Sequence, residues 1–333
     1  MQPIILSTVT PVYSGEAYLE ALVAEMNRLR TAWESDNGPV HFAEAIFVDD
    51  AARDNSPKVL ARLAKQYPWI RVITLSRNFG QHSATVAGIL HSSGDWIVTL
   101  DEDLQHPPAN IVDLLRAAVD SNADVVYGRP EKSVHSGWFR DLSSRAYKRC
   151  LAFATDNDAA LDFSSFRLIR GSVARATSAV CGHETYFDVA LSWFTDRYRA
   201  VRLPLHDRRT MQGGASGYSV RRLLSHARKA IVSSHSRLLR LSVLLGGVAV
   251  VLAATFGTRA LVLRLQGNFA DVRGWTSLFV SVLFFGGVAC LLLGVVLEYL
   301  VNVVLHTQGK PPFFVVDRTS DELVSAWFRD RQS

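Results

Sequence analysis

The sequence lacks the cysteine pattern that would indicate a disulfide framework or a zinc site. Its 333 residues include only three cysteines. They are far apart and form no CxxC pair, so we expect reduced and chemically inert thiols. The amino terminus also lacks a basic segment followed by an apolar run long enough for a signal peptide. We therefore expect the soluble part of the chain to remain in the cytoplasm.

Two nucleotide-binding signatures are missing as well. No GxGxxG follows the first apolar run, which argues against a dinucleotide-binding oxidoreductase, and no GxxxxGK[ST] occurs, which argues against a P-loop enzyme. The charge is nearly balanced, with 36 Lys plus Arg against 31 Asp plus Glu, so a dedicated nucleic-acid surface is not expected. A chain of this length can hold one sizeable domain plus a smaller element.

The first part of the chain shows a regular alternation of apolar patterns. Short runs rich in β-branched residues alternate with helical patterns, which is typical of an α/β fold with a mostly parallel sheet and crossover helices. The predicted strands cover 4–9, 45–48, 70–75, 96–100 and 124–127. The predicted helices cover 17–33, 56–67, 82–91 and 108–121. Residues 129–206 show no pattern that assigns an element.

The last third of the chain contains two uncharged runs. Residues 241–258 and 276–297 each approach the roughly 20 residues that a bilayer span requires, so we predict two transmembrane helices joined by a hairpin at 266–275. Residues 217–240 carry six cations and no acid, which places this flank in the cytoplasm. Apolar residues recur there at helical spacing, as in an interfacial amphipathic helix, although an ordinary solvated helix is the alternative.

These features divide the chain into four parts. We predict an α/β domain over 1–216, an amphipathic juxtamembrane helix over 217–237, the two spans over 238–305 and a cytoplasmic tail over 306–333.

Acidic residues follow two of the predicted strands. Asp101, Glu102 and Asp103 follow one, and Asp49 and Asp50 end another at the same edge of the sheet. Alternate carboxylates at a strand end can share a hard cation, although a solvated turn is the simpler alternative for the first cluster alone. Two acidic clusters beside a nucleotide would repel it unless a divalent ion intervened. We therefore expect Mg²⁺ or Mn²⁺ as the cofactor.

Several motifs taken together resemble a known family. The segments TPVY at 10–13, VDD at 48–50, LSRNFG at 75–80, SGD at 93–95 and DEDLQHPP at 101–108 resemble the family-2 glycosyltransferases. The resemblance is to the branch of polyprenyl-phosphate and dolichyl-phosphate sugar transferases. Each motif alone is weak, whereas their order and spacing are specific.

The resemblance extends to the carboxyl-terminal third. The segments GWTSL at 274–278, the glycines at 286, 287 and 294, EYL at 298–300 and KPP at 310–312 resemble the two-span membrane tail of the bacterial members. The resemblance implies a GT-A Rossmann-like fold, a nucleotide-sugar donor that we expect to carry UDP, and undecaprenyl phosphate as the acceptor. It also implies the bacterial inner membrane, a product used in lipopolysaccharide or another envelope glycan, and a homo-oligomer, suggested to be a tetramer.

The resemblance also assigns roles to individual residues. It implies a metal site formed by Asp101, Asp103 and Gln105, and catalytic roles for Asp103, Gln105 and Arg129. The residues implied on the nucleotide-sugar side are Pro11, Tyr13, Glu16, Asp49, Asp50, Asn78 and Asp101. The residues implied to bind the acceptor phosphate are Arg129, Arg140, Ser144 and Arg208.

One motif departs from the family pattern. The segment 162–167 resembles a Gly-Asp-Phe-Arg sequence of several bacterial members, but Ser165 replaces their aspartate. A carboxylate base at this position is therefore in doubt. A phosphate monoester has its second pKa at about 6, so the acceptor oxygen is already mostly anionic at neutral pH and can attack without losing a proton. The expected reaction is a single displacement with inversion.

Two other interpretations stay open. A processive polysaccharide synthase shares the acidic sheet edge, but such enzymes usually have more spans and a QxxRW signature, which this sequence lacks. A non-catalytic membrane scaffold would require a damaged acidic site, and the acidic residues here are intact. For His82, at the predicted start of a helix, a capping role and a ligand contact are equally compatible with the sequence.

Overall fold

The computed structural model describes residues 3–36, 38–131, 163–182, 185–204, 274–308 and 311–317, with isolated residues between 248 and 262 and residue 321. Three predicted site residues, Arg140, Ser144 and Arg208, lie outside the described residues. The predicted amphipathic segment 217–237 and most of the first predicted span lie outside them as well.

The described elements alternate between strands and helices over most of the chain. The strands are β1 (Ile4–Val12), β2 (Val40–Asp49), β3 (Ile70–Thr74), β4 (Trp96–Thr99), β5 (Val125–Pro130), β6 (Arg167–Arg170) and β7 (Tyr198–Leu203). The helices are α1 (Leu19–Asp36), α2 (Ser56–Gln66), α3 (Gln81–Leu90), η1 (Pro108–Asn110), α4 (Ile111–Asp120), α6 (Gly171–Val180), α7 (Phe187–Leu191) and α11 (Gly274–Thr307).

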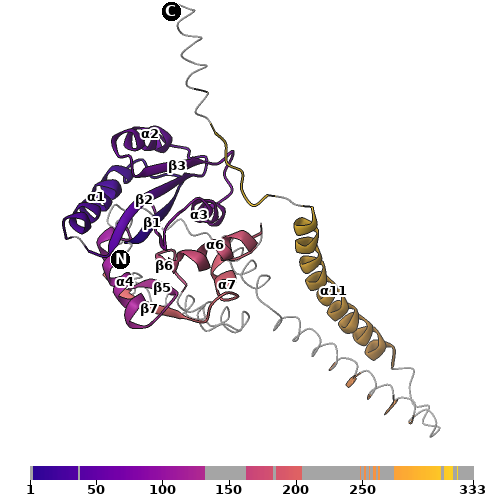
Figure 1. Ribbon diagram of the computed structural model, residues 1–333. Helices are drawn as coiled ribbons and strands as arrows, with labels where there is room; N and C mark the ends of the chain where they lie inside the picture. Colours follow the sequence, from indigo (N-terminus) through magenta and orange to yellow (C-terminus); the bar gives the residue numbers. More distant parts are fainter. Residues whose placement is uncertain are drawn as a thin grey trace, which may run out of the picture.

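In the described part of the chain, seven strands form one sheet in the order β3-β2-β1-β4-β6-β5-β7 (Figure 1). Every neighbouring pair is parallel except the two that involve β6. The parallel strands therefore end at one edge of the sheet, which we call the carboxyl edge. At this edge the register places Asp49 between Val12 and Thr74. Loops after β1, β2, β3 and β4 meet there.

Helices cover both faces of the sheet. Side chains of α1, α2 and α4 pack into one apolar cluster, and side chains of α3, α6 and α7 pack into a second cluster. Figure 1 shows the sheet between these two groups of helices. Because both faces are covered, a central strand can be buried at every position, as β4 is. This explains why the strands appear in the sequence as continuous apolar runs.

The predicted α/β architecture agrees with this sheet. All five predicted strands and four predicted helices are present, with ends that differ by a few residues; the expected helix at 108–121 begins as the separate 3-10 turn η1. Residues 163–204, for which no element was predicted, contain β6, α6, α7 and β7. The antiparallel strand β6 separates β4 from β5. Its position depends on pairing with strands distant in sequence, which local patterns do not encode.

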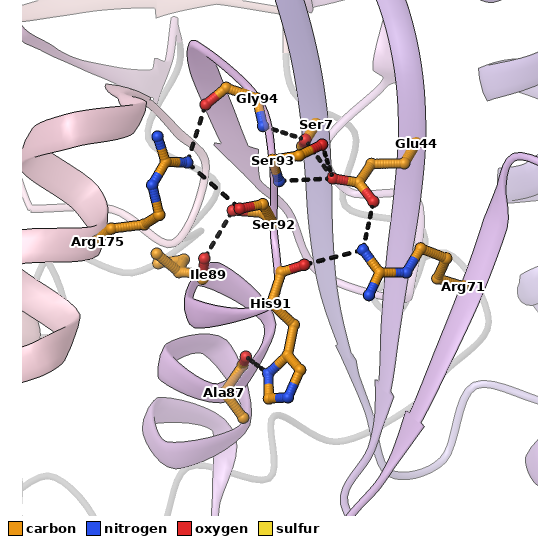
Figure 2. Close-up of polar contacts among 10 residues, drawn as sticks. All are labelled: Ser7, Glu44, Arg71, Ala87, Ile89, His91, Ser92, Ser93, Gly94 and Arg175. Atoms are coloured by element: carbon orange, nitrogen blue, oxygen red, sulfur yellow. Dashed lines mark hydrogen bonds and ion pairs between the residues drawn. The ribbon is translucent and has the colours of Figure 1, made fainter.

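A buried polar cluster lies at the opposite, amino edge of the sheet (Figure 2). One carboxylate oxygen of Glu44 accepts hydrogen bonds from the Ser7 hydroxyl at 2.9 Å and from the Ser93 amide at 2.7 Å. Its other oxygen pairs with Arg71 at 2.7 Å. Burial alone would raise the pKa of Glu44, but the bonds from Arg71, Ser93 and Ser7 outweigh burial and lower it. The cluster joins β1, β2 and β3 to the turn before β4.

Helix α11 is long and apolar. Its 18-residue window Phe284–Val301 is apolar enough to cross a membrane, and none of this window is buried inside the protein. It is the one such helix in the described residues. The helix includes the second predicted span and begins at Gly274, so the last two residues of the expected hairpin are helical. The existence of two spans stays a prediction.

The chain returns to the sheet after α11. Val315 forms an antiparallel bridge with Leu75, just beyond the end of the edge strand β3. Figure 1 shows this segment passing beside β3. We call residues 313–316 the C-terminal strap. Phe313 and Val315 pack against the second apolar cluster. The predicted tail at 306–333 therefore includes a segment that belongs to the sheet edge.

Candidate active site

The middle residue of the acidic motif holds a loop. Glu102 is buried, and its Oε2 accepts a hydrogen bond from the Tyr13 amide at 2.9 Å, while its Oε1 accepts one from the Ser14 amide at 3.2 Å. A Cβ atom at Gly15 would lie 2.7 Å from Oε2 of Glu102. Any other residue at position 15 would require the Glu102 carboxylate to move. Glu102 thus ties the loop after β1 to the loop after β4, which leaves Asp101 and Asp103 for other roles.

Asp101 lies at the centre of the carboxyl edge. Its Oδ1 accepts a hydrogen bond from Nε2 of Gln81 at 2.6 Å, and its Oδ2 accepts one from the Ser165 hydroxyl at 2.8 Å. Its side chain is 26% exposed. Both of these partners are neutral hydrogen-bond donors, and the carboxylate is accessible. These properties suit a carboxylate that binds a cation.

The His106 side chain lies beside Asp101. The Asp101 amide donates to Nδ1 of His106 at 3.3 Å, so this nitrogen is an acceptor and carries no proton. Nδ1 also lies 3.7 Å from Oδ2 of Asp101, a separation that would indicate an ion pair only if the ring were protonated. The His106 ring stacks on Phe166 at 5.0 Å between centroids. The imidazole is therefore packed between Asp101 and the Phe166 ring.

Asp103 is almost fully buried. Its side chain accepts a hydrogen bond from the Gln105 amide at 3.2 Å, which closes a tight turn. Leu104, inside this turn, has φ of 59°, and Ala51, directly after Asp50, has φ of 52°. Left-handed conformations cost non-glycine residues about 1–2 kcal/mol each. Backbone strain thus occurs beside both acidic clusters, as is common at functional sites.

The second acidic pair is engaged with backbone groups. Asp50 accepts hydrogen bonds from the amides of Phe79 at 2.7 Å and Gly80 at 2.8 Å. Asp49 accepts one from the Ala52 amide at 2.8 Å. Burial raises the pKa of Asp50; the two amide bonds oppose this rise, and the charge of Asp49 adds to it. Asp50 thus fixes the loop after β3, and its predicted contact with a nucleotide stays a prediction.

The other predicted residues on the nucleotide side lie at the same edge. Tyr13 stacks with Arg53, whose guanidinium carbon lies 5.7 Å from the ring centroid. Glu16 accepts hydrogen bonds from the backbone and side-chain amides of Asn55 at 3.1 and 3.0 Å. Asn78 is exposed in the loop after β3. The loops after β1 and β2 are therefore joined to each other, and both border the acidic residues.

A cavity of about 280 Å³ opens beside Asp101. Its lining comes from the ends of β1 and β4, the start of α3, the segment before β6 and the α7 region. The lining residues are Pro11, Gln81, His82, Thr85, Thr99, Leu100, Asp101, Phe163, Ser164, Ser165, Arg167, Tyr186 and Asp188. Of the predicted site residues, the structure places Pro11 and Asp101 in this lining. His82 contacts Tyr186 edge to face, with centroids 4.7 Å apart.

A buried ion pair forms the inner wall of the cavity. Arg167 pairs with Asp188, and both side chains are at most 5% exposed. The Tyr127 hydroxyl donates to Asp188 at 3.1 Å. Burial and the nearby Asp188 carboxylate raise the pKa of Tyr127 well above its usual value, so the phenol stays protonated. These three residues hold the segment that carries Ser165 against β5 and α7.

Several residues that line or support the cavity were not predicted as site residues. Gln81, Tyr186 and Asp188 carry no recognisable spacing, although Gln81 and His82 directly follow the RNFG segment. Tyr127, Arg167 and Asp188 meet through β5, β6 and α7, which are far apart in sequence. Arg129 lies near the end of β5 and is partly buried, beside Arg202 of β7. The cavity does not include Arg129 in its lining.

The described residues could supply some of the ligands of a divalent-ion site. No group of three or more His, Cys, Asp or Glu side chains that could hold a metal occurs among the described residues. Asp101, Asp103 and Gln105 lie in one tight turn, and Asp101 is accessible. Mg²⁺ commonly uses one or two carboxylates, with water and substrate phosphates as the remaining ligands. The turn suits this mode of binding, in which the substrate completes the site.

The one cysteine whose surroundings are described agrees with the expectation of inert thiols. Cys181 is free and buried, and burial raises its pKa to about 12. A thiol is the weakly reactive form, so this side chain is not a nucleophile at neutral pH.

A mostly parallel sheet with acidic loops at its carboxyl edge and an adjacent cavity is the arrangement of α/β proteins whose ligands bind beyond the carboxyl ends of the strands. The family model described as Glycosyl transferase family 2 matches residues 7–177. This match covers more than half of the chain, and the protein belongs to this family.

Solved structures with a similar fold include two synthases. Glucosyl-3-phosphoglycerate synthase from Mycobacterium tuberculosis, in complex with Mn²⁺ and UDP-glucose, is 18% identical; the match covers 69% of this chain and 77% of that chain, with a TM-score of 0.48. Mannosyl-3-phosphoglycerate synthase from Rubrobacter xylanophilus is 13% identical; the match covers 81% and 77% of the two chains, with a TM-score of 0.44.

Proposed function

We propose that this family-2 glycosyltransferase transfers one sugar from a nucleotide sugar, preferably a UDP-sugar, to undecaprenyl phosphate at the cytoplasmic face of the bacterial inner membrane. The lipid-linked product would supply lipopolysaccharide or another envelope glycan. Mg²⁺ or Mn²⁺ would be required, and the Mn²⁺ and UDP-glucose present in the mycobacterial neighbour are compatible with both cofactor and donor.

The position of the acidic edge relative to the apolar helix supports a membrane-bound acceptor most directly. Strand β7 runs parallel to β5 and ends at Leu203 on the carboxyl edge. The chain continues from there toward the cationic segment 217–240 and the first uncharged run. After α11 it returns to the same edge, where Val315 pairs with Leu75. The edge that carries Asp50 and Asp101 thus also receives both connections to the apolar segments.

Chain length limits how far this edge can be from the end of α11. Phe314 in the strap lies seven positions after Thr307, the last residue of α11. An extended chain spans about 3.5 Å per residue, so the sheet edge lies within about 25 Å of the helix end. If α11 crosses the bilayer, the acidic residues are close enough to the surface to reach a lipid phosphate.

The proposed chemistry is a direct displacement. An oxygen of the lipid phosphate attacks the anomeric carbon while the bond from that carbon to the nucleotide diphosphate breaks, so the configuration inverts. Asp101, Asp103 and Gln105 would hold the divalent ion, which supplies charge stabilisation for the departing diphosphate. Because the phosphate nucleophile is already anionic, no side chain has to remove a proton. Gln81 and Ser165 orient Asp101, and the loop after β1 is fixed by Glu102.

A panel of donors and acceptors tests the proposal. Purified full-length protein in detergent or nanodiscs is given UDP-glucose, UDP-N-acetylglucosamine, a UDP-amino sugar or GDP-mannose, together with Mn²⁺ and undecaprenyl phosphate. Mass spectrometry of the lipid fraction should detect one added sugar for one of the donors. Parallel reactions contain 3-phosphoglycerate instead of the lipid. Transfer to 3-phosphoglycerate without transfer to the lipid would contradict the proposed acceptor.

The same panel separates the alternatives. A processive synthase would extend its product by many sugars, whereas the proposed enzyme stops after one. A non-catalytic scaffold would give no product with any combination and no release of nucleoside diphosphate.

A further inference from the structure

We propose that the C-terminal strap, residues 313–316, is a positioning element for the donor side of the active site. It pairs with the end of β3 and thereby fixes residues 76–80. The amides of this loop bind Asp50, and the loop leads into α3. The identity of the positioned ligand rests on the proposed function; the structural coupling itself does not.

The strap is bound to β3 by backbone hydrogen bonds on both sides of the bridge. The Ser76 amide donates to the Phe314 carbonyl at 2.9 Å, and the Val316 amide donates to the Thr74 carbonyl at 2.9 Å. The Phe313 and Val315 side chains pack against the cluster that contains Ile73 and Leu75. By contrast, the Phe314 side chain is 59% exposed. The strap thus binds through its backbone and alternate side chains, as an added edge strand does.

The paired end of β3 leads directly into the loop that contacts Asp50. Ser76, whose amide is bound by the strap, is followed three residues later by Phe79, whose amide donates to Asp50. The Gly80 amide donates to the same carboxylate. Gly80 has φ of 93°, a conformation that favours glycine. This five-residue stretch, 76–80, is therefore fixed at its start by the strap and at its end by Asp50.

The same loop fixes the residue that orients Asp101. Gln81 directly follows Gly80 and is the first residue of α3. Its side-chain amide donates to Oδ1 of Asp101 at 2.6 Å. A shift of the loop would move Gln81 and weaken this bond. The strap is thus connected to Asp101 through a short, continuous series of contacts that begins at Ser76.

The location of the strap in the chain gives this coupling a functional consequence. The strap follows α11, so the apolar helix and the donor side of the site are linked by a short segment. Loss of the strap should loosen the loop and weaken donor binding, while the displacement step, once the donor is bound, should change little. We therefore expect a rise in the donor KM with a nearly unchanged kcat.

Two variants at one position isolate the backbone contact in the full-length protein. Val316→Pro removes the amide that donates to Thr74, whereas Val316→Ala also loses the branched valine side chain but keeps this amide. A third variant, Phe314→Ala, changes only an exposed side chain and keeps the carbonyl that accepts from Ser76. Hydrogen exchange measured by mass spectrometry reports on residues 74–81, and titration with UDP and Mn²⁺ reports on donor-side binding without an acceptor.

Val316→Pro should raise exchange in residues 74–81 roughly threefold to tenfold over Val316→Ala, the range expected for one lost backbone hydrogen bond. UDP binding and the donor KM should weaken by a similar factor, and Phe314→Ala should match the parent protein. Equal exchange and equal UDP affinity in the two Val316 variants would overturn the proposal. Faster exchange with unchanged UDP affinity would also overturn it, because the strap would then be merely structural.

A milder variant covers the case in which Val316→Pro does not fold. Val315→Thr keeps both backbone bonds and places a hydroxyl against Ile73 and Leu75, so the strap should bind less tightly without loss of the domain. Its exchange in residues 74–81 and its UDP affinity should change in the same direction. No change in either would contradict the proposal. Hydrogen exchange and UDP affinity can both be measured without an acceptor. Failure of the enzyme to use any lipid acceptor would therefore refute only the proposed acceptor.

Discussion

The Ser165 hydroxyl donates a hydrogen bond to Oδ2 of Asp101 at 2.8 Å. Ser165, which stands where the family pattern described above has an aspartate, therefore contacts the accessible carboxylate of the acidic motif. An aspartate at position 165 would place a second negative charge there. In this protein, a neutral donor orients Asp101, and the carboxylate charge is available to a cation.

Under the proposed function, Ser165→Ala should keep most of the turnover, because a phosphate nucleophile attacks without losing a proton and Gln81 still orients Asp101. We expect a fall in kcat of less than about tenfold, the effect of one neutral hydrogen bond. Steady-state rates with saturating donor and lipid measure this. A loss of roughly a thousandfold with the lipid still bound would show that the hydroxyl takes part in the chemistry.

Asp103→Asn should lower the rate by roughly a hundredfold or more, because the divalent ion loses a charged ligand and the departing diphosphate loses several kcal/mol of stabilisation. EDTA should abolish transfer by the parent protein, and Mg²⁺ or Mn²⁺ should restore it. Asp113→Asn, on the exposed side of α4, is the matched control and should behave as the parent protein does. Full transfer in EDTA would contradict the metal site.

Glu44→Gln should reduce stability at neutral pH without affecting the donor KM, since Glu44 lies at the amino edge of the sheet. Its folded-state pKa is lowered from 4.5. The stabilising effect of this carboxylate is therefore complete above about pH 4.5 and is lost as the pH falls through the folded-state value. Loss of charged hydrogen bonds to a buried group costs about 2 kcal/mol.

Denaturant titrations at several pH values test this prediction. The difference in unfolding free energy between the parent protein and Glu44→Gln should be largest near neutral pH and should shrink in acid. A difference that is constant from neutral to acid pH would show that the ionised form of Glu44 contributes nothing.

Leu293→Arg should impair insertion of α11, because Leu293 lies near the middle of the apolar window and an arginine there costs about 3 kcal/mol. The parent protein should stay in the membrane fraction after a carbonate wash, and the variant should be partly released or degraded. Leu293→Ala is the control and should stay in the membrane. Complete release of the parent protein by carbonate would refute the proposed span.

The sequence was sufficient for those parts of the molecule that depend on local pattern. The runs from Ala45 and Trp96 are mostly apolar at successive positions, so their burial in a sheet could be predicted, and the acids after them could be assigned to the carboxyl edge. The wall formed by Tyr127, Arg167 and Asp188 could not be predicted, because it depends on how β5, β6 and α7 pack against one another.

The role of each acidic residue could not be predicted from the sequence either. Glu102 lies in the same acidic cluster as Asp101, and Asp50 lies in the second cluster, yet both carboxylates bind backbone amides of neighbouring loops. Which acid turns outward is decided by the turn around Leu104 and by the glycines at 15 and 80, and these conformations follow from tertiary contacts. The strap was missed for the same reason, because a single bridge between Leu75 and Val315 joins segments 240 residues apart.

The two end strands of the sheet also bear on how the protein avoids pairing of edge strands between molecules. An exposed edge strand is a template for pairing with another chain. Strand β7 at one end carries the exposed cations Arg199 and Arg202, which discourage such pairing. Strand β3 at the other end is covered at its carboxyl end by the strap. A soluble fragment that stops before α11 would uncover the backbone groups of Thr74 and Ser76 beside apolar Leu75, and this fragment would be prone to aggregate through β3.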